Sequence, residues 1–223
     1  MLIKKYKKTN CLDGCILFND DSEYLYWENR KETSDEVEIV EYINQNYHNE
    51  QIKILHIGIG NSYISSNIKS YDKIDGITIS MNEIVHARKL GIKNYNVFFM
   101  NKLSHEAFSK DKFFDYDIII DVNLKSFSCC LKAFDNLFLN YVTMLKENGK
   151  IITGSRGMNW SRMVKPVFSF SFKKFFYKRL KEFNGPEINK LKFDESKELC
   201  RKNNLLFQQY KDSSVIAFQK SIK

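Results

Sequence analysis

The stretch KILHIGIGNSYISSNI, residues 53–68, decides the fold. Apolar and β-branched residues lead into two glycines, Gly58 and Gly60, and polar residues that suit a helix follow. Because glycine has no Cβ, such a turn lets the backbone approach a ligand closely. A dinucleotide site would carry a third glycine where this chain has Tyr63. A nucleotide-shaped ligand is one interpretation of the turn. A tight turn without a ligand is the other, because a glycine pair alone does not separate them.

Strand-like and helix-like segments alternate through the middle of the chain. Residues 116–122 form an apolar run typical of a strand buried on both faces, and apolar residues recur at helical spacing from Phe127 to Leu145. Repeated strand–helix–strand order predicts a parallel sheet with right-handed crossovers. The predicted strands are 53–60, 73–80, 94–100, 116–122 and 151–153, and the helices between them are 61–70, 81–90 and 127–145.

The two ends of the chain differ from this pattern. Residues 15–27 predict a hairpin, and a helix with Ser34 as its N-cap is predicted over 34–47. Residues 205–220 predict two antiparallel strands around a short turn, which close the sheet. The segment 156–193 is aromatic and basic without a clean period, and it predicts an inserted cap.

The predicted fold class is therefore α/β, a Rossmann-like, doubly wound, mostly parallel seven-stranded sheet with an N-terminal hairpin and helix extension and a cap after the fifth strand. No internal repeat or low-complexity linker divides the chain, so one domain is expected over residues 1–223. Its parts are an extension over 1–34, a ligand-binding core over 53–153, the cap over 156–193 and a closing helix with antiparallel strands over 194–223.

Composition narrows the class of protein. A hydrophobic content of 43% over 223 residues suffices for a packed core. The sequence shows no run of 18 apolar residues and no signal-peptide core, so a soluble, cytoplasmic protein without a transmembrane segment is expected. Five cysteines are present, and the pair in CLDGC, Cys11 and Cys15, has no second pair to complete a zinc site, so reduced thiols are favoured. The net charge of +8 fits either an anionic partner or a lysine-rich surface.

Residues 53–153 resemble a class I S-adenosylmethionine-dependent methyltransferase. ILHIGIGNS is similar to the first motif of that family, GITIS to the end of its second strand, FFDYDIIIDVNL to its fourth-strand motif and LKENGKIIT to its fifth strand. The motifs occur in order and cover about half of the chain. The resemblance implies S-adenosylmethionine as the cofactor. It also implies methyl transfer to an oxygen or nitrogen of a small molecule, such as a sugar or a phosphorylated metabolite.

The resemblance also implies where the cofactor lies. Gly58 and Gly60 match the positions under its methionine part, and Asn101 matches a position that often contacts the adenine amino group. His56 replaces a frequent carboxylate near the amino group of the cofactor, although a hydrogen-bonded core residue is the commoner role of a strand-end histidine. The implied cofactor-binding residues are His56, Gly58, Gly60, Asn61, Ser62, Thr78, Ile79, Ser80, Asn101, Asp121, Val122 and Asn123.

The end of the second strand departs from the usual pattern. Thr78 stands where the family has an acidic residue for the ribose hydroxyls, but its cyclopropane fatty acid synthase group reads much like GITIS at this point. A hydroxyl is therefore the expected ribose contact. Ser80, Asn82 or Glu83 could help, and Glu83 is expected to matter less than Thr78.

Methyl transfer depends more on holding the acceptor nucleophile in line with the methyl group than on acid–base catalysis, because the sulfonium donor is already activated. Where an acceptor needs a base, Asp121 is the best-placed carboxylate. In the cap, Arg156, Trp160 and Arg162 are the predicted contacts to the acceptor, with an anionic group expected on it. No cluster has metal-ligand spacing, so a metal-dependent mechanism is disfavoured. Weaker candidates for a base are His86, His105, Lys125 and Arg156.

Other functions stay open. The positive charge favours an RNA-modifying methyltransferase, but the sequence shows no recognisable RNA-binding module. A non-catalytic Rossmann-like binding protein is compatible with the departures at His56 and Thr78. A nicotinamide-dependent oxidoreductase is disfavoured, because Tyr63 replaces a glycine that packs helix on strand and Thr78 lacks the ribose-binding carboxylate. The oligomeric state is not predicted.

Overall fold

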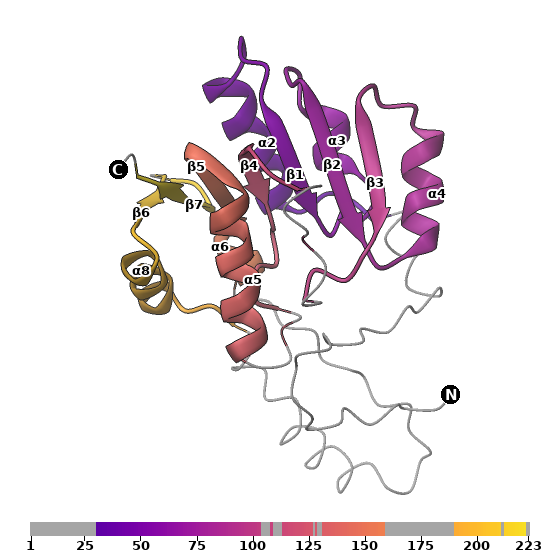
Figure 1. The fold of residues 1–223 in the computed structure, drawn as a ribbon. Coiled ribbons are helices and arrows are strands. Elements are labelled where there is room, and N and C mark those ends of the chain that lie inside the picture. The colour runs from indigo at the N-terminus through magenta and orange to yellow at the C-terminus, as the bar shows by residue number, and fades with distance from the viewer. Residues whose placement is uncertain are drawn as a thin grey trace, which may run out of the picture.

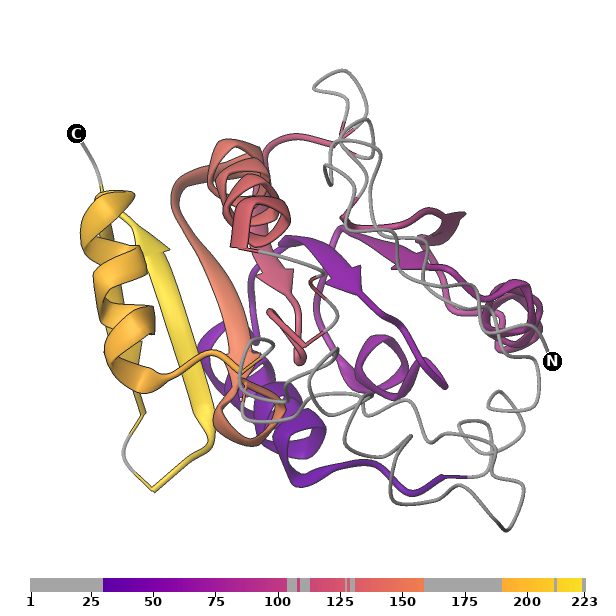
Figure 2. The ribbon, with the colours of Figure 1, turned by 90° about the horizontal axis from the view of Figure 1, so that it is seen from below.

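The computed structural model of the chain describes residues 30–103, 108, 113–126, 128, 131–158, 190–210 and 212–221. The predicted hairpin over 15–27 and most of the predicted cap over 156–193 lie outside these residues. The described elements form a single sheet with helices on both of its faces (Figures 1 and 2). The expected α/β class is confirmed.

The sheet has the strand order β3-β2-β1-β4-β5-β7-β6. Strands β1 to β5 pair in parallel, whereas β7 is antiparallel to both β5 and β6. The sheet is therefore mixed, and the seven strands and the reversed pair agree with the sequence prediction. The strands are β1 Lys53–Ile57, β2 Lys73–Thr78, β3 Tyr95–Phe99, β4 Tyr116–Ile120, β5 Leu145–Gly154, β6 Leu205–Gln209 and β7 Val215–Lys220.

Strand β5 is longer than the predicted 151–153. It begins at Leu145, which pairs with Tyr116, and the register then shifts so that Lys150 faces Ile118. The KENG segment that reads as a turn in the sequence is accommodated in this irregularity rather than before the strand.

The helix boundaries correct two sequence predictions. Thr33, not Ser34, is the N-cap of α2, because its hydroxyl accepts from the N–H of Glu36 while the Glu36 carboxylate accepts from the N–H of Thr33. The helix expected over 61–70 is only the five-residue α3, because the residues before it form the turn. The helices are α2 Ser34–Asn46, α3 Tyr63–Asn67, α4 Met81–Lys89, α5 Leu131–Met144, α6 Ser155–Met158 and α8 Phe193–Lys202.

The sheet separates two apolar clusters. Ile119 of β4 packs with the α5 side chains Phe134, Phe138 and Tyr141 on one face, whereas Ile118 packs against α2 and α3 on the other. All three β4 isoleucines are fully buried, which confirms the strand predicted to be covered on both faces. The predicted helical stripe is also confirmed where its side chains are described.

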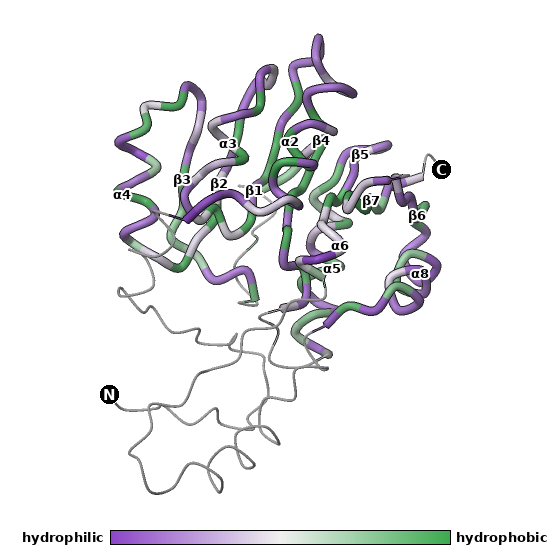
Figure 3. Tube along the Cα trace, turned by 180° about the vertical axis from the view of Figure 1, so that it is seen from behind, coloured by the Kyte–Doolittle hydropathy of each residue, from purple (hydrophilic) through white to green (hydrophobic). Residues whose placement is uncertain are grey.

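Hydrophobic residues concentrate along the central strands and hydrophilic residues on the outer turns, whereas hydrophilic and hydrophobic residues alternate along α4 (Figure 3). Among the described helices, none combines the length and the apolar character that crossing a membrane requires. The parallel strands β1, β2 and β3 all point to one edge of the sheet, the lower edge in Figure 1, onto which Figure 2 looks.

Candidate functional site

Three strand ends meet at this carboxyl edge. The register pairs Ile57 with Ile77 and His56 with Ile120, so the chain leaves β1, β2 and β4 at the same level. The next residues, Gly58, Thr78 and Asp121, therefore emerge as neighbours. The structure thus brings together the centres of three of the sequence motifs.

The loop between β1 and α3 has a left-handed backbone at three positions. The φ angle is 70° at Gly58, 52° at Gly60 and 62° at Ser62. The N–H of Gly58 donates to the carbonyl of Ile77 at 2.8 Å, which fixes the loop to β2. A Cβ added at Gly58 would meet no atom within 4 Å. Backbone conformation, not packing, therefore favours glycine at position 58, and its main chain borders open space.

Glu83 reaches the edge from the first turn of α4. One carboxylate oxygen accepts a hydrogen bond from the Thr78 hydroxyl at 2.5 Å, and the Gly60 N–H also contacts the carboxylate. Burial raises the pKa of Glu83, although both hydrogen bonds and the Arg30 charge oppose the rise. A carboxylate from the next helix thus lies at the end of β2, and the Thr78 hydroxyl donates to it.

Tyr95 of β3 supports the loop from inside the protein. Its hydroxyl lies 3.2 Å from Oγ of Ser62, and burial raises the pKa of Tyr95 to about 12, so the phenol stays neutral. A Cβ added at Gly76 would lie 2.9 Å from both the Ile59 side chain and the Tyr95 ring. The glycine of GITIS is therefore needed for packing under the loop.

His56 is a buried, neutral residue. Its Nδ1 lies 2.9 Å from Oγ of Ser65 in α3, and the residue is 2% exposed. Burial lowers the pKa of His56 to about 4. The imidazole therefore carries no charge at neutral pH and links β1 to α3. Contact between His56 and a cofactor stays a prediction.

Asp121 is held by two side chains that the sequence analysis did not assign to the site. Its Oδ2 accepts from Nζ of Lys102 at 2.6 Å and from the hydroxyl of Tyr141 at 2.9 Å. Lys102 also donates to the carbonyl of Asn123 at 3.2 Å and thereby ties the residues after β3 to those after β4. Tyr141 was recognisable only as a core residue of the α5 stripe, and no sequence signal marked Lys102.

Other predicted positions use their polar groups within the edge itself. Oδ1 of Asn101 accepts from the N–H of Leu103 at 3.0 Å, and the carbonyl of Val122 accepts from Thr153 at 3.1 Å. Ser80 caps α4. The remaining positions, which are half-buried at the same edge, are Asn61, Ile79 and Asn123.

Arg30 is a further residue beside the loop that sequence reasoning missed. A Cβ added at Gly60 would lie 4.0 Å from its guanidinium, and its carbonyl accepts from the Asn61 amide at 3.4 Å. The guanidinium forms a bidentate ion pair with Glu36 at 2.8 and 2.9 Å. The capping box of α2 thus holds a cation against the glycine loop.

No protein-family model and no curated protein matches the sequence, but solved structures match the fold. The N-methyltransferase NodS from Bradyrhizobium japonicum WM9, in complex with S-adenosyl-L-homocysteine, gives a TM-score of 0.59 at 12% identity over 91% of this chain and 99% of that chain. Magnesium protoporphyrin IX methyltransferase (ChlM) from Synechocystis PCC 6803, with bound S-adenosylhomocysteine, gives 0.60 at 11% identity over 92% and 96%. The chain has the class I methyltransferase fold.

The methyltransferase fold does not by itself fix a reaction. The [4+2]-cyclase SpnF also matches, with a TM-score of 0.52 at 12% identity over 79% of this chain and 59% of that chain. At such identities the likeness shows the fold alone.

Of the three predicted acceptor contacts, the structure describes only Arg156, which lies on the β5 side of the sheet. Arg156 is exposed on α6, directly after β5, whereas Trp160 and Arg162 lie outside the described residues. Lys125 is 4% exposed, pairs with Glu195 of α8 and lies over the Phe134 ring. Its ion pair gives Lys125 a structural role. His105 lies outside the described residues.

Proposed function

We propose that this protein transfers a methyl group from S-adenosylmethionine to an oxygen or nitrogen of a small molecule. The observation that supports this best is the loop from Gly58 to Ser62, whose open main chain lies at the carboxyl edge beside the half-buried carboxylate of Glu83. In open α/β sheets, ligands bind at this edge. The S-adenosylhomocysteine in NodS and in ChlM supports the choice of cofactor.

The residues at the edge fit this cofactor. Gly58 and Gly60 would lie under its methionine part, where a side chain would take up the space of the ligand. The Glu83 carboxylate would accept hydrogen bonds from the ribose hydroxyls, and Asn101 would lie near the adenine. When bound, S-adenosylmethionine supplies a methyl group that its sulfonium has already activated.

The main task of the protein is then to hold the acceptor in line with that methyl group. Asp121 is the proposed contact, through the oxygen that Lys102 and Tyr141 leave free of their hydrogen bonds. Because Lys102 compensates its charge, Asp121 is better suited to orient an acceptor by accepting a hydrogen bond than to remove a proton.

Titration calorimetry of the full chain with S-adenosylmethionine, S-adenosylhomocysteine and NAD tests the assignment. We expect the first two to bind and NAD not to bind. A response to NAD alone would overturn the proposal. A screen with radiolabelled S-adenosylmethionine against small hydroxyl and amine acceptors then tests transfer itself.

The loop can be tested with a matched pair of glycines. Gly58 and Gly91 have φ angles of 70° and 61°, and a Cβ at either would meet no atom within 4 Å. Alanine at each should cost about 1–2 kcal/mol of stability from left-handed strain. Only Gly58→Ala should weaken the binding of S-adenosylhomocysteine, by tenfold or more. Gly91 follows the C-terminal end of α4, away from the loop, so Gly91→Ala should leave the affinity unchanged. Equal binding losses in the two variants would argue against a ligand on the loop.

The net charge of +8 keeps an RNA-modifying methyltransferase as the second candidate. RNA binding that falls steeply with salt, together with label transfer to RNA in the same screen, would favour it over a small acceptor.

A further inference from the structure

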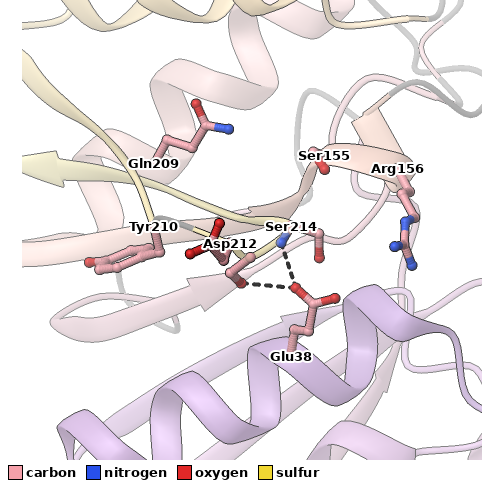
Figure 4. Close-up of a pocket in the computed structure, with 8 residues that line it drawn as sticks. Glu38, Ser155, Arg156, Gln209, Tyr210, Asp212 and Ser214 are labelled. Atoms are coloured by element: carbon pink, nitrogen blue, oxygen red, sulfur yellow. Dashed lines mark hydrogen bonds between the residues drawn. The ribbon is translucent and has the colours of Figure 1, made fainter.

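A second concave site lies at the same edge of the sheet, beyond β5. This pocket has a volume of about 580 Å³ and is walled by α2, α6, the end of β6 and the turn between β6 and β7 (Figure 4). It includes no residue of the glycine loop. It is therefore separate from the proposed cofactor site.

One wall of the pocket is fixed by Glu38 of α2. Its Oε2 accepts from the N–H of Ser214 at 2.5 Å and from the hydroxyl of Ser213 at 2.9 Å. The backbone bond from Ser214 is the main cause that lowers the pKa of Glu38, so the carboxylate stays charged at neutral pH. The helix and the β6–β7 turn are thus held in place before any ligand arrives.

The pocket contains a buried hydroxyl, that of Ser214, whose hydrogen bonding is incomplete among the described residues. Ser214 is 7% exposed, and within the described part of the chain its Oγ makes no hydrogen bond of ordinary geometry, although it lies close enough to contribute to the lowered pKa of Glu38. Leaving a buried polar group unsatisfied costs free energy. A ligand with a polar group at this point would remove that cost.

The residues that line the pocket include positive and negative charges and both hydrogen-bond donors and acceptors. Arg156 donates, Asp212 accepts and Gln209 does both, and Arg156 and Asp212 lie on opposite sides of the Glu38 carboxylate (Figure 4). An anionic ligand would meet two carboxylates, a cationic one would meet Arg156, and an apolar one would leave the polar groups without partners. A neutral, hydroxyl-rich ligand suits the lining, because each hydroxyl both donates and accepts.

The pocket lies near the end of β4, where the proposed methyl transfer takes place. In the order β4-β5-β7 it lies two strands from the end of β4. Adjacent strands are about 4.8 Å apart, so the part of the separation that runs along the sheet is roughly 10 Å. We propose that the pocket binds the uncharged, carbohydrate end of an elongated acceptor whose other end lies beside Asp121. The inference rests on the proposed function and replaces the anionic group that the sequence analysis expected beside Arg156.

The test is a titration of the ¹⁵N-labelled full chain with maltose, glucose and glucose 6-phosphate. We expect maltose to shift the amide signals of Gln209, Ser213 and Ser214, and glucose to bind no more weakly than its phosphate. Arg156→Gln should lower maltose affinity about tenfold or more, and Ser214→Ala about fivefold. Ser214→Ala should change the urea midpoint little, because among the described residues this hydroxyl makes no hydrogen bond of ordinary geometry.

Ser128→Ala is the matched control. Ser128 is 3% exposed, and among the described residues its Oγ also has no hydrogen-bond partner, but it lies outside the pocket. Maltose affinity should be unchanged in this variant. Equal affinity in all three variants, no shift at the pocket amides, or tighter binding of glucose 6-phosphate than of glucose would overturn the inference.

S-adenosylhomocysteine titrated into the same sample separates the two proposals. Its binding without any maltose binding would overturn the carbohydrate site and leave the methyltransferase proposal in place. A wild-type protein that binds no S-adenosylhomocysteine would overturn the proposed function itself.

Discussion

Two carboxylates at the same edge, half-buried Glu83 and buried Asp121, are held in different ways. Glu83 accepts a hydrogen bond from the neutral hydroxyl of Thr78, and burial raises its pKa. Asp121 accepts from the ammonium of Lys102 and from the hydroxyl of Tyr141. The charge of Asp121 is therefore compensated inside the fold, whereas the carboxylate of Glu83 can gain from hydroxyl donors on a ligand.

The largest effect should come from removing the compensating cation. Lys102→Met leaves the Asp121 charge buried and unpaired, so urea unfolding should show a loss of about 3–5 kcal/mol. Glu83→Gln should change stability by about 1 kcal/mol or less, because an amide can still accept from Thr78.

The double variant Lys102→Met with Asp121→Asn is the control for Lys102. It removes the unpaired charge and should recover most of the lost stability. A loss below about 1 kcal/mol for Lys102→Met alone would show that the two carboxylates do not differ as described.

The next effect concerns cofactor affinity. Glu83→Gln should weaken the binding of S-adenosylhomocysteine by about 1.5–3 kcal/mol, the range for hydrogen bonds to a charged group. Thr78→Ala should weaken it by about 0.5–1.5 kcal/mol, the range for a neutral hydrogen bond. This order reverses the ranking expected from the sequence, because the Thr78 hydroxyl already donates to Glu83. Calorimetry on both variants decides it. A larger loss for Thr78→Ala would restore the original ranking.

The smallest effect is in the pH dependence of stability. Burial raises the pKa of Glu83 above its ordinary value of 4.5, so its contribution to stability is present below that value and lost as pH rises through the folded pKa. As pH rises from acidic to neutral, the free energy of unfolding of Glu83→Gln should therefore increase relative to that of the wild type. Urea unfolding at several pH values measures this difference.

Glu36 is the matched control of opposite sign. Burial acts to raise its pKa, but the Arg30 guanidinium and the Thr33 hydrogen bonds prevail and lower it. The contribution of Glu36 to stability is present above pH 4.5 and lost as pH falls through the folded pKa. As pH rises from acidic to neutral, the free energy of unfolding of Glu36→Gln should therefore decrease relative to that of the wild type. If the stability difference from the wild type changed with pH in the same direction in both variants, the opposite pKa shifts of Glu83 and Glu36 would be contradicted.

The sheet could be predicted because its signals are local. The apolar run of β4 and the stripe of α5 follow from periodicity, and GIG marks the turn after β1. The N-cap was misplaced by one residue because both Thr33 and Ser34 can cap, and only the reciprocal contact with Glu36 selects Thr33. The length of β5 depends on a register irregularity opposite Tyr116, which no local pattern reveals.

The site was harder to predict because its contacts join distant segments. Lys102 and Asp121 are 19 residues apart and meet only when the ends of β3 and β4 are placed in one sheet. Glu83 was visible as a nearby polar residue, but its contact with Thr78 depends on the direction in which α4 leaves β2. Motif positions therefore predict where a ligand lies better than they predict the contacts among the side chains there.

The position of β7 affects how the chain reaches this fold. Although β7 comes after β6 in the chain, it lies between β5 and β6 in the sheet. Strand β5 ends at Gly154 and its partner on that side begins at Val215, so at about 5–20 residues per second a ribosome needs roughly 3–12 seconds to make the chain between them. Until then this edge of β5, with Ile151 and Ile152, has no strand to pair with. Unpaired apolar edges pair with other chains, so the nascent protein depends on β7 to cover an aggregation-prone edge.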